Sequence, residues 1–197
     1  MADDLHPSPN RSRNPRDAGG PVGIALVGMG WWGKKMLSVL EAVPQDIAVL
    51  RAVEPNLDSV RELCAEKRIP LSADYANALN DPAVEAVVLA TPHALHEAQI
   101  EAAVAAGKHI FCEKPLALTK AGAEKAARLC RDAGLVLGMG HERRFEPPIA
   151  DMLARADAGE LGRIHQIEAN FSHDKFLALD RDNWRLKADH APAGGME

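Results

Sequence analysis

Short apolar runs alternate with stretches of mixed polarity along most of the chain, from residue 21 to residue 140. The runs have the length and near-continuous apolar character of buried strands. Six are predicted, at residues 22–27, 47–53, 69–72, 86–90, 109–112 and 135–139. Helices are predicted between them, at residues 31–43, 56–67, 74–79, 95–106 and 119–133. This alternation indicates an α/β fold in which helices cover both faces of a doubly wound parallel sheet.

The pattern changes at both ends of the chain. Residues 1–20 are rich in Pro, Asn, Ser, Arg and Asp and nearly free of large apolar residues, so we expect a disordered tail. Beyond residue 140 we expect a helix at 148–158, a turn at Leu161-Gly162 and a long alternating strand at 163–171. The predicted organisation is a tail (1–20), a nucleotide-binding domain (21–140) and the beginning of an incomplete α+β second domain (141–197).

A glycine-rich turn follows the first apolar run. Gly28, Gly30 and Gly33 have the spacing G-x-G-x-x-G, which provides a tight bend, a close approach to a pyrophosphate and close packing of helix on strand. Since the motif follows a strand and opens a helix, it predicts a Rossmann-type domain that binds NAD(P). Met29 and Trp32, inside the motif, are expected to contact the cofactor as well.

Glu54 ends the second apolar run, about twenty residues after the last glycine, as the dinucleotide motif requires. A carboxylate there would accept hydrogen bonds from the adenosine ribose and repel a 2′-phosphate, so NAD is favoured over NADP. Arg51 is near enough in sequence to leave NADP open. The alternative for Glu54 is a solvated loop acid.

Two further groups follow predicted strands, where ligands bind in open α/β sheets. Thr91, Pro92 and His96 come after the fourth strand and are predicted to bind the cofactor, with helix capping or local packing as the alternative for His96. Glu113 and Lys114 come after the fifth strand, followed by a proline, Pro115, that is a candidate for a cis bond. Glu113 could bind ribose, and Lys114 could stabilise a developing negative oxygen unless it is simply a solvated lysine.

Composition limits the kinds of binding partner and the cellular compartment that we expect. A net charge of −5 gives no general attraction to nucleic acid or acidic lipid, and no apolar run is long enough to span a membrane. The three cysteines form no C-x-x-C pair, so we expect neither a disulfide framework nor a metal site. A small-molecule substrate and a cytoplasmic location fit best.

Together these motifs resemble the glucose-fructose oxidoreductase / inositol dehydrogenase / MocA (Gfo/Idh/MocA) family. The resemblance rests on G-M-G-W-W-G at 28–33, A-T-P-H-A-L-H at 90–96, C-E-K-P-L-A-L-T at 112–119, G-M-G-H-E-R-R-F at 138–145, Leu161-Gly162 and N-W-R at 183–185. It implies that Lys114 is the active-site lysine beside nicotinamide and substrate. His141, Arg144, Trp184 and Arg185 match substrate-side or domain-interface positions. One departure is His93, where the family often has asparagine.

The resemblance also implies a second domain with a large antiparallel sheet and a proton-transferring histidine shortly after a Gly-Gly segment. Gly194-Gly195 lies two residues from the end of the sequence, so we expect a truncated chain without that histidine. His165, His173 and His190 do not match its position and are expected to be surface or structural residues. The full-length form is expected to be a homo-oligomer.

The predicted function is therefore hydride transfer between NAD, or less favourably NADP, and a CH–OH group of a sugar, polyol or related small molecule. For this chain we expect cofactor binding with weak or absent turnover. The alternative is a non-catalytic nucleotide-binding or partner-binding module, in which the strand at 163–171 pairs with another chain.

Overall fold

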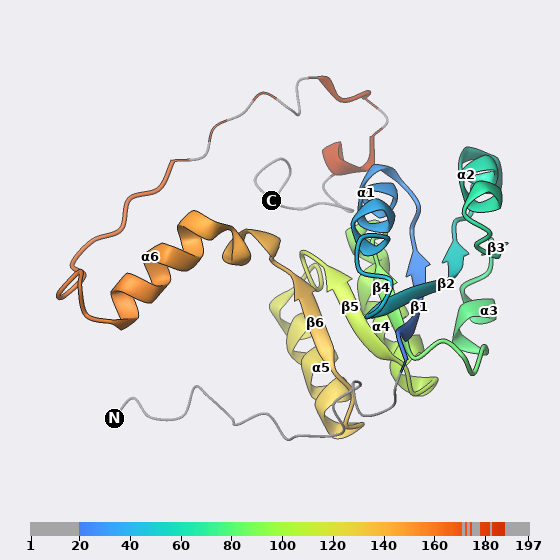
Figure 1. Cartoon of the computed structure of the whole chain (residues 1–197), viewed down its shortest axis with the longest axis horizontal. Helices are drawn as coiled ribbons and strands as arrows, with labels where there is room; N and C mark the ends of the chain where they lie inside the picture. The colour runs from blue at the N-terminus through green and yellow to red at the C-terminus, as the bar shows by residue number, and fades with distance from the viewer. Residues whose placement is uncertain (1–19, 171, 173, 175–177, 182, 188–197) are drawn as a thin grey trace. The chain divides into compact units, whose positions relative to one another are not determined.

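The structure is a computed structural model of the chain and describes residues 20–170, 172, 174, 178–181 and 183–187 (Figure 1). Its strands are β1 (Val22–Val27), β2 (Ile47–Val53), β3 (Leu71–Ser72), β4 (Ala86–Leu89), β5 (His109–Glu113) and β6 (Leu137–Gly140). They form one six-stranded sheet in the order β3-β2-β1-β4-β5-β6. This is the strand order of the dinucleotide-binding fold, so the predicted Rossmann-type sheet is confirmed.

The helices lie between the strands, as the alternating pattern predicts. The α-helices are α1 (Trp31–Leu40), α2 (Arg61–Glu66), α3 (Tyr75–Leu79), α4 (His96–Ala105), α5 (Lys120–Asp132) and α6 (Pro147–Asp157). Short 3-10 helices are η2 (Leu57–Ser59), η3 (His93–Leu95), η4 (Glu142–Phe145) and η6 (Trp184–Leu186).

The chain divides into two compact units, residues 1–86 and residues 87–197, which are described separately below. In the first unit β1 pairs with β2 in parallel, from Val22 opposite Ile47 to Val27 opposite Val53. The strand β3 extends this sheet beside Ala52 and Val53. Most of β1 is fully buried, as expected for a strand covered on both faces.

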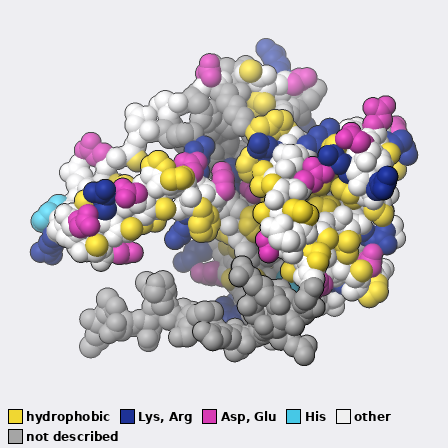
Figure 2. All heavy atoms as spheres, in the orientation of Figure 1, with side chains coloured by type: hydrophobic (Ala, Val, Ile, Leu, Met, Phe, Trp, Pro, Cys, Tyr) yellow, Lys and Arg dark blue, Asp and Glu magenta, His cyan; other side chains and the backbone are white. Residues whose placement is uncertain are grey.

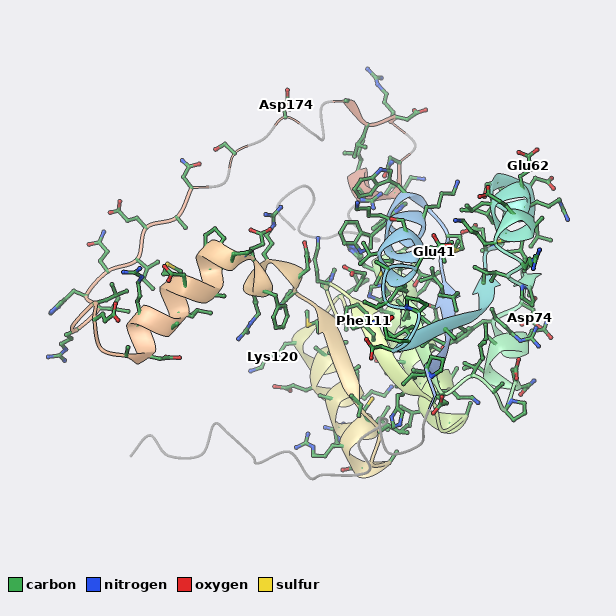
Figure 3. All side chains as sticks on the ribbon, viewed as in Figure 1. Glu41, Glu62, Asp74, Phe111, Lys120 and Asp174 are labelled. Atoms are coloured by element: carbon green, nitrogen blue, oxygen red, sulfur yellow. The ribbon has the colours of Figure 1, made fainter. Side chains whose placement is uncertain are left out.

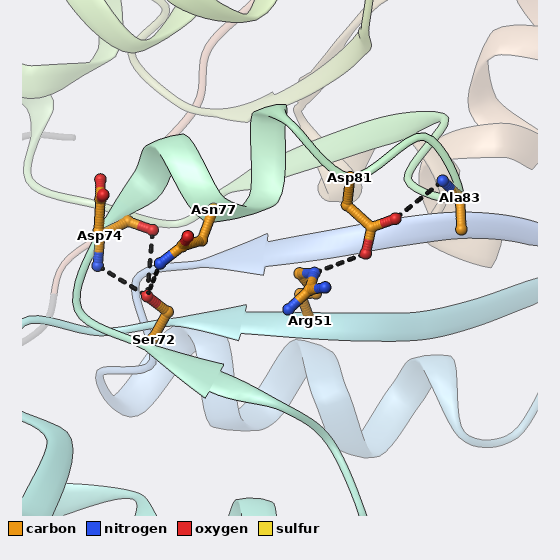
Figure 4. A network of polar contacts seen from close by, with 6 residues as sticks. All are labelled: Arg51, Ser72, Asp74, Asn77, Asp81 and Ala83. Carbon is orange, nitrogen blue, oxygen red and sulfur yellow. Dashed lines mark hydrogen bonds and ion pairs between the residues drawn. The ribbon is translucent and has the colours of Figure 1, made fainter.

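Polar contacts at one side of the first unit fix the segment from β3 to β4 (Figure 4). Asp74 caps α3 by accepting a hydrogen bond from the backbone N–H of Ala76 at 2.8 Å. Asp81 accepts from the Arg51 guanidinium at 2.6 Å and from the backbone N–H of Ala83 at 2.9 Å. Arg51 is therefore held by a carboxylate within the unit.

In the second unit β5 and β6 are parallel, from Ile110 opposite Leu137 to Glu113 opposite Gly140. Phe111 of β5 lies over Gly138 of β6, where an added Cβ would meet its ring at 3.1 Å (Figure 3). The helices α4 and α5 are joined by Lys125, whose ammonium lies 2.6 Å from Glu101 and 3.5 Å from Glu97.

Several predicted boundaries shift for local reasons. The first helix ends at Leu40 rather than at residue 43, because the chain turns at residues 41–42 ahead of Pro44. The helix expected from Asn56 starts as the 3-10 turn η2. The Asn56 side chain forms no capping bond, while its backbone N–H donates to Glu54.

The long strand predicted at 163–171 is wrong for the part that the structure describes. Residues 164–170 have no regular secondary structure, and Ile164 and Ile167 are exposed. An alternating strand is stable only when a neighbouring strand pairs with its backbone and an apolar surface covers one face. Neither is provided among the described residues. Phe171, the tail at 1–19, His173, His190 and Gly194-Gly195 lie outside the described part of the chain.

Candidate functional site

The three glycines of the turn after β1 have three different structural roles. Gly28 has φ +88°, in the region that favours glycine, and its N–H donates to the carbonyl of Val53 at 2.8 Å. At Gly33 an added Cβ would lie 2.0 Å from the carbonyl oxygen of Gly28, so α1 packs directly on the turn. At Gly30 an added Cβ would meet nothing within 4 Å. The backbone at Gly30 is thus open to a ligand.

The N-terminus of α1 is suited to an anion. The helix has 10 residues and begins after Gly30, with no capping side chain and no acidic residue in its first turn. The first N–H groups of a helix need acceptors, and its dipole favours negative charge there. A pyrophosphate supplies both, so the residues present fit the dinucleotide that the motif predicts.

The Glu54 carboxylate lies at the same turn. Its Oε2 accepts from the backbone N–H of Met29 at 2.9 Å, and its Oε1 accepts from the backbone N–H of Asn56 at 3.1 Å. These bonds hold the carboxylate beside the glycine turn. Met29 itself is buried, at 1% exposure, and its backbone N–H is the one that Glu54 accepts from.

Trp31 and Trp32 stack beside the turn, with ring centroids 5.5 Å apart. Trp31 is exposed, whereas the Nε1 of Trp32 is buried and has no hydrogen-bond acceptor among the described residues. The predicted contact residue Trp32 therefore lies in the first turn of α1, half-buried and stacked on Trp31.

In the second unit, residues that follow β4 and β5 meet at His96. This ring is fully buried; its Nδ1 lies 2.7 Å from the Pro115 carbonyl oxygen and its Nε2 lies 3.0 Å from the Thr91 carbonyl oxygen. Both ring nitrogens are thus engaged by the backbone, which favours the packing alternative for His96. Lys114 precedes Pro115, and the peptide bond between them is cis, as the sequence suggested.

The other predicted cofactor residues of this unit are partly or fully buried. Thr91 donates its hydroxyl to Gln99 Oε1 at 2.5 Å, and Pro92 precedes η3. Glu113 is 8% exposed and its carboxylate lies against Gly140, where an added Cβ would come within 2.5 Å of it. Burial, with the Glu113 charge as a smaller cause, raises the pKa of the Cys112 thiol to about 12.

Sequence reasoning did not assign a role to His93, yet the structure places it at the centre of a cluster. Its ring meets the Trp184 ring edge-on at 4.6 Å between centroids, and the Arg185 guanidinium lies 4.4 Å from the centroid of the Trp184 ring. Burial lowers the pKa of His93 to about 4, and electrostatic interactions with His96, Lys114 and Arg185 act in the same direction. The signal in the sequence was the departure at His93 from the family pattern that the chain resembles.

In this cluster, Trp184 and Arg185 lie beside the segment after β4, whereas the other substrate-side candidates are exposed to solvent. His141 directly follows β6 and Arg144 lies in η4, and both are exposed. His165 is exposed too, as expected for a surface histidine.

The described residues lack two kinds of feature. None of their helices has both the length and the apolar character needed to cross a membrane. They contain no group of three or more His, Cys, Asp or Glu side chains arranged to hold a metal ion.

Comparison with known proteins places these features in a family. A family model described as "Oxidoreductase family, NAD-binding Rossmann fold" matches residues 22–141. The 1,5-anhydro-D-fructose reductase of Ensifer adhaerens is 38% identical over 59% of this chain and 34% of its own length. The scyllo-inositol 2-dehydrogenase (NAD(+)) of Bacillus subtilis is 40% identical over 52% of this chain and 29% of its own length.

A solved structure has the same fold. GenD2 from gentamicin A biosynthesis, crystallised in complex with NAD, superposes with a TM-score of 0.68 at 29% identity, over 72% of this chain and 40% of that chain. The present chain thus spans about a third of the length of these curated relatives.

Proposed function

Since the chain belongs to the Gfo/Idh/MocA family of oxidoreductases, we propose that it binds NAD and forms the cofactor-binding part of a dehydrogenase acting on CH–OH groups. The observation that supports this best is that the three glycines of the turn have different structural roles. Gly28 makes the bend, Gly33 packs against it and Gly30 is open to a ligand. The Glu54 carboxylate is held beside them.

The cofactor would be held by groups at the carboxyl ends of the strands. The N–H groups at the start of α1 would bind the pyrophosphate, and Glu54 would accept hydrogen bonds from the adenosine ribose. Thr91 and Pro92, which follow β4, and Glu113, the last residue of β5, would border the nicotinamide half. Trp32 would support the turn by packing.

NAD supplies the hydride acceptor, so the protein has to orient the alcohol and manage its proton. Lys114 would donate a hydrogen bond to the reacting oxygen and stabilise the negative charge that develops on it. The hydride would pass to NAD and the hydroxyl proton to the proton-transferring histidine that the family resemblance implies. The names of the relatives, an anhydrofructose reductase and an inositol dehydrogenase, support a sugar or polyol as substrate. His141, Arg144, Trp184 and Arg185 are the candidates for contacts with its hydroxyl groups.

NAD is preferred to NADP in this proposal because of two carboxylates. Glu54 would repel a 2′-phosphate, while Arg51, the nearby cation that could have bound one, is paired with Asp81 at 2.6 Å.

Calorimetric titration of the chain with NAD and NADP tests this assignment. We expect NAD to bind at least about tenfold more tightly than NADP, since a phosphate facing a carboxylate costs more than about 1.4 kcal/mol. In Glu54→Gln this preference should shrink, whereas Glu85→Gln, on an exposed acid of the same unit, should preserve it. Failure of the wild-type chain to bind either dinucleotide would refute the proposal.

The cellular compartment and the type of substrate that we propose follow from the composition and from the state of the cysteines. Cys64, Cys112 and Cys130 are all free and buried, which suits a reducing, cytoplasmic compartment. The net charge of −5 favours a small-molecule substrate over nucleic acid or a membrane surface. The full-length form is proposed to be a homo-oligomer.

A partner-binding module is the second candidate, favoured by exposed apolar side chains in residues 145–167. Figure 2 shows hydrophobic side chains along α6 among charged ones. Phe145 and Ile167 are each 81% exposed, and Met152 is 51% exposed. Such exposure would suit a surface that another chain covers. Light scattering after size-exclusion chromatography tests it, since a monodisperse monomer at high concentration would argue against this candidate.

A further inference from the structure

His96 lies at the start of α4 with its ring fully buried, and it reaches two backbone segments of the second unit. The Pro115 carbonyl oxygen is 2.7 Å from its Nδ1, and the Thr91 carbonyl oxygen is 3.0 Å from its Nε2. Thr91 belongs to the segment after β4 and Pro115 to the segment after β5. A single side chain therefore lies between two segments that are distant in sequence.

The chemistry of the ring makes these two contacts unequal. Burial lowers the pKa of His96, although the two backbone contacts act in the opposite direction, so the ring is neutral at pH 7. A neutral imidazole has one N–H, and a carbonyl oxygen can only accept. We assign the proton to Nδ1, because the Pro115 contact is the shorter. The stronger bond then holds the residue that directly follows Lys114.

We propose that His96 is a positioning residue: its bond to the Pro115 carbonyl fixes the backbone at Lys114, the lysine assigned to the reacting oxygen, against the segment after β4. This inference rests on the proposed function. It replaces direct cofactor contact by His96 with an indirect role, because both ring nitrogens already face backbone oxygens.

Three substitutions separate the two contacts. The amide nitrogen of asparagine can occupy the position of Nδ1, the amide nitrogen of glutamine can approach that of Nε2, and leucine fills the space without a donor. His109→Leu is a matched control, since His109 lies at the opposite end of β5 and also bonds the backbone, accepting from the N–H of Val136 at 3.0 Å.

Calorimetric titration of the full chain with NAD and with ADP-ribose gives the readout. ADP-ribose lacks the nicotinamide, so its affinity reports the glycine turn and Glu54 but not the surroundings of Lys114. We expect His96→Leu and His96→Gln to weaken NAD about tenfold while ADP-ribose affinity is unchanged. His96→Asn and His109→Leu should keep the wild-type ratio of the two dissociation constants.

A merely structural histidine would give a different pattern. Equal losses for both ligands, an unchanged ratio in His96→Gln, or an Asn variant as weak as the Gln variant would each overturn the inference. If His96→Leu does not fold, the contrast between the Asn and Gln variants still decides. A wild-type chain that binds neither ligand would overturn the proposed function, and this inference with it, whereas normal ADP-ribose binding leaves the proposed function standing.

Discussion

Two glycines of the turn after β1 share a motif but differ in what a side chain would meet. Gly33 has no room, since an added Cβ would lie 2.0 Å from the Gly28 carbonyl oxygen. We expect Gly33→Ala to lower the free energy of unfolding by about 2 to 4 kcal/mol, because backbone rather than a flexible side chain must move. Urea denaturation followed by circular dichroism measures this change.

Gly30→Ala is the matched variant, because an added Cβ at Gly30 meets nothing within 4 Å and its φ of −64° suits alanine. We expect its free energy of unfolding to change by less than about 1 kcal/mol. Its NAD affinity should fall on the order of tenfold or more, since the methyl group would occupy the space where backbone meets pyrophosphate. Equal losses of stability in the two variants would contradict this separation of roles.

His93 gives the protein a stability that depends on pH. Its pKa is lowered from 6.5 to about 4 in the folded chain. Between these values an unfolded chain binds a proton that the folded chain does not, so stability is lost as the pH falls through this window, by at most about 3 kcal/mol. Unfolding midpoints at pH 7.5, 5.5 and 4.5 measure the loss.

In His93→Asn the loss of stability between pH 7.5 and pH 4.5 should be smaller than in the wild type, because asparagine does not titrate. His165→Asn, on an exposed histidine, controls for removal of a histidine as such. Parallel profiles for the wild type and His93→Asn would show that His93 is not the group responsible.

Residues with local roles could be predicted from the sequence, and residues with tertiary roles could not. Gly28, Gly33 and Glu54 could be recognised because their spacing along the chain determines the turn. His93 was not, because its partner Trp184 reaches it only in the folded second unit. The burial of His96 between two carbonyl groups could likewise not be predicted, since nothing near His96 in the sequence specifies Pro115 as a partner.

At the scale of elements, hydrophobic runs located every strand of the sheet, because a buried strand needs apolar residues on both faces. The ends of helices were less predictable, since turns and caps decide them. The failure at 163–171 has a different cause: alternation describes a surface that a sheet could bury, but the described residues offer no strand to pair with it.

The helix α5 begins with a capping side chain that the structure shows and the sequence analysis did not single out. Thr119 precedes the helix, and its hydroxyl oxygen accepts from the backbone N–H of Gly122 at 3.0 Å. We expect Thr119→Ala to lower the free energy of unfolding by about 1 kcal/mol, because that N–H loses its acceptor. Thr119→Ser retains the oxygen and should lie within about 0.5 kcal/mol of the wild type in urea denaturation. A serine variant as unstable as the alanine variant would assign the effect to the lost methyl group instead.

At the scale of the whole molecule, binding and stability are linked. A ligand that binds only the folded chain stabilises it according to its concentration relative to Kd, by about 2.7 kcal/mol at about a hundredfold Kd. We therefore expect NAD to raise the unfolding midpoint of the wild-type chain in a concentration-dependent manner, measured by differential scanning calorimetry.

The parts of the dinucleotide should contribute unequally to that shift. The glycine turn and Glu54 would hold the adenosine half, with the start of α1 on the pyrophosphate, so ADP-ribose should reproduce most of the stabilisation. Nicotinamide mononucleotide, which lacks the adenosine, should give little at the same concentration. A larger shift with the mononucleotide than with ADP-ribose would place the main affinity at Thr91 and Lys114 instead, and would remove the glycine turn from the centre of the proposed site.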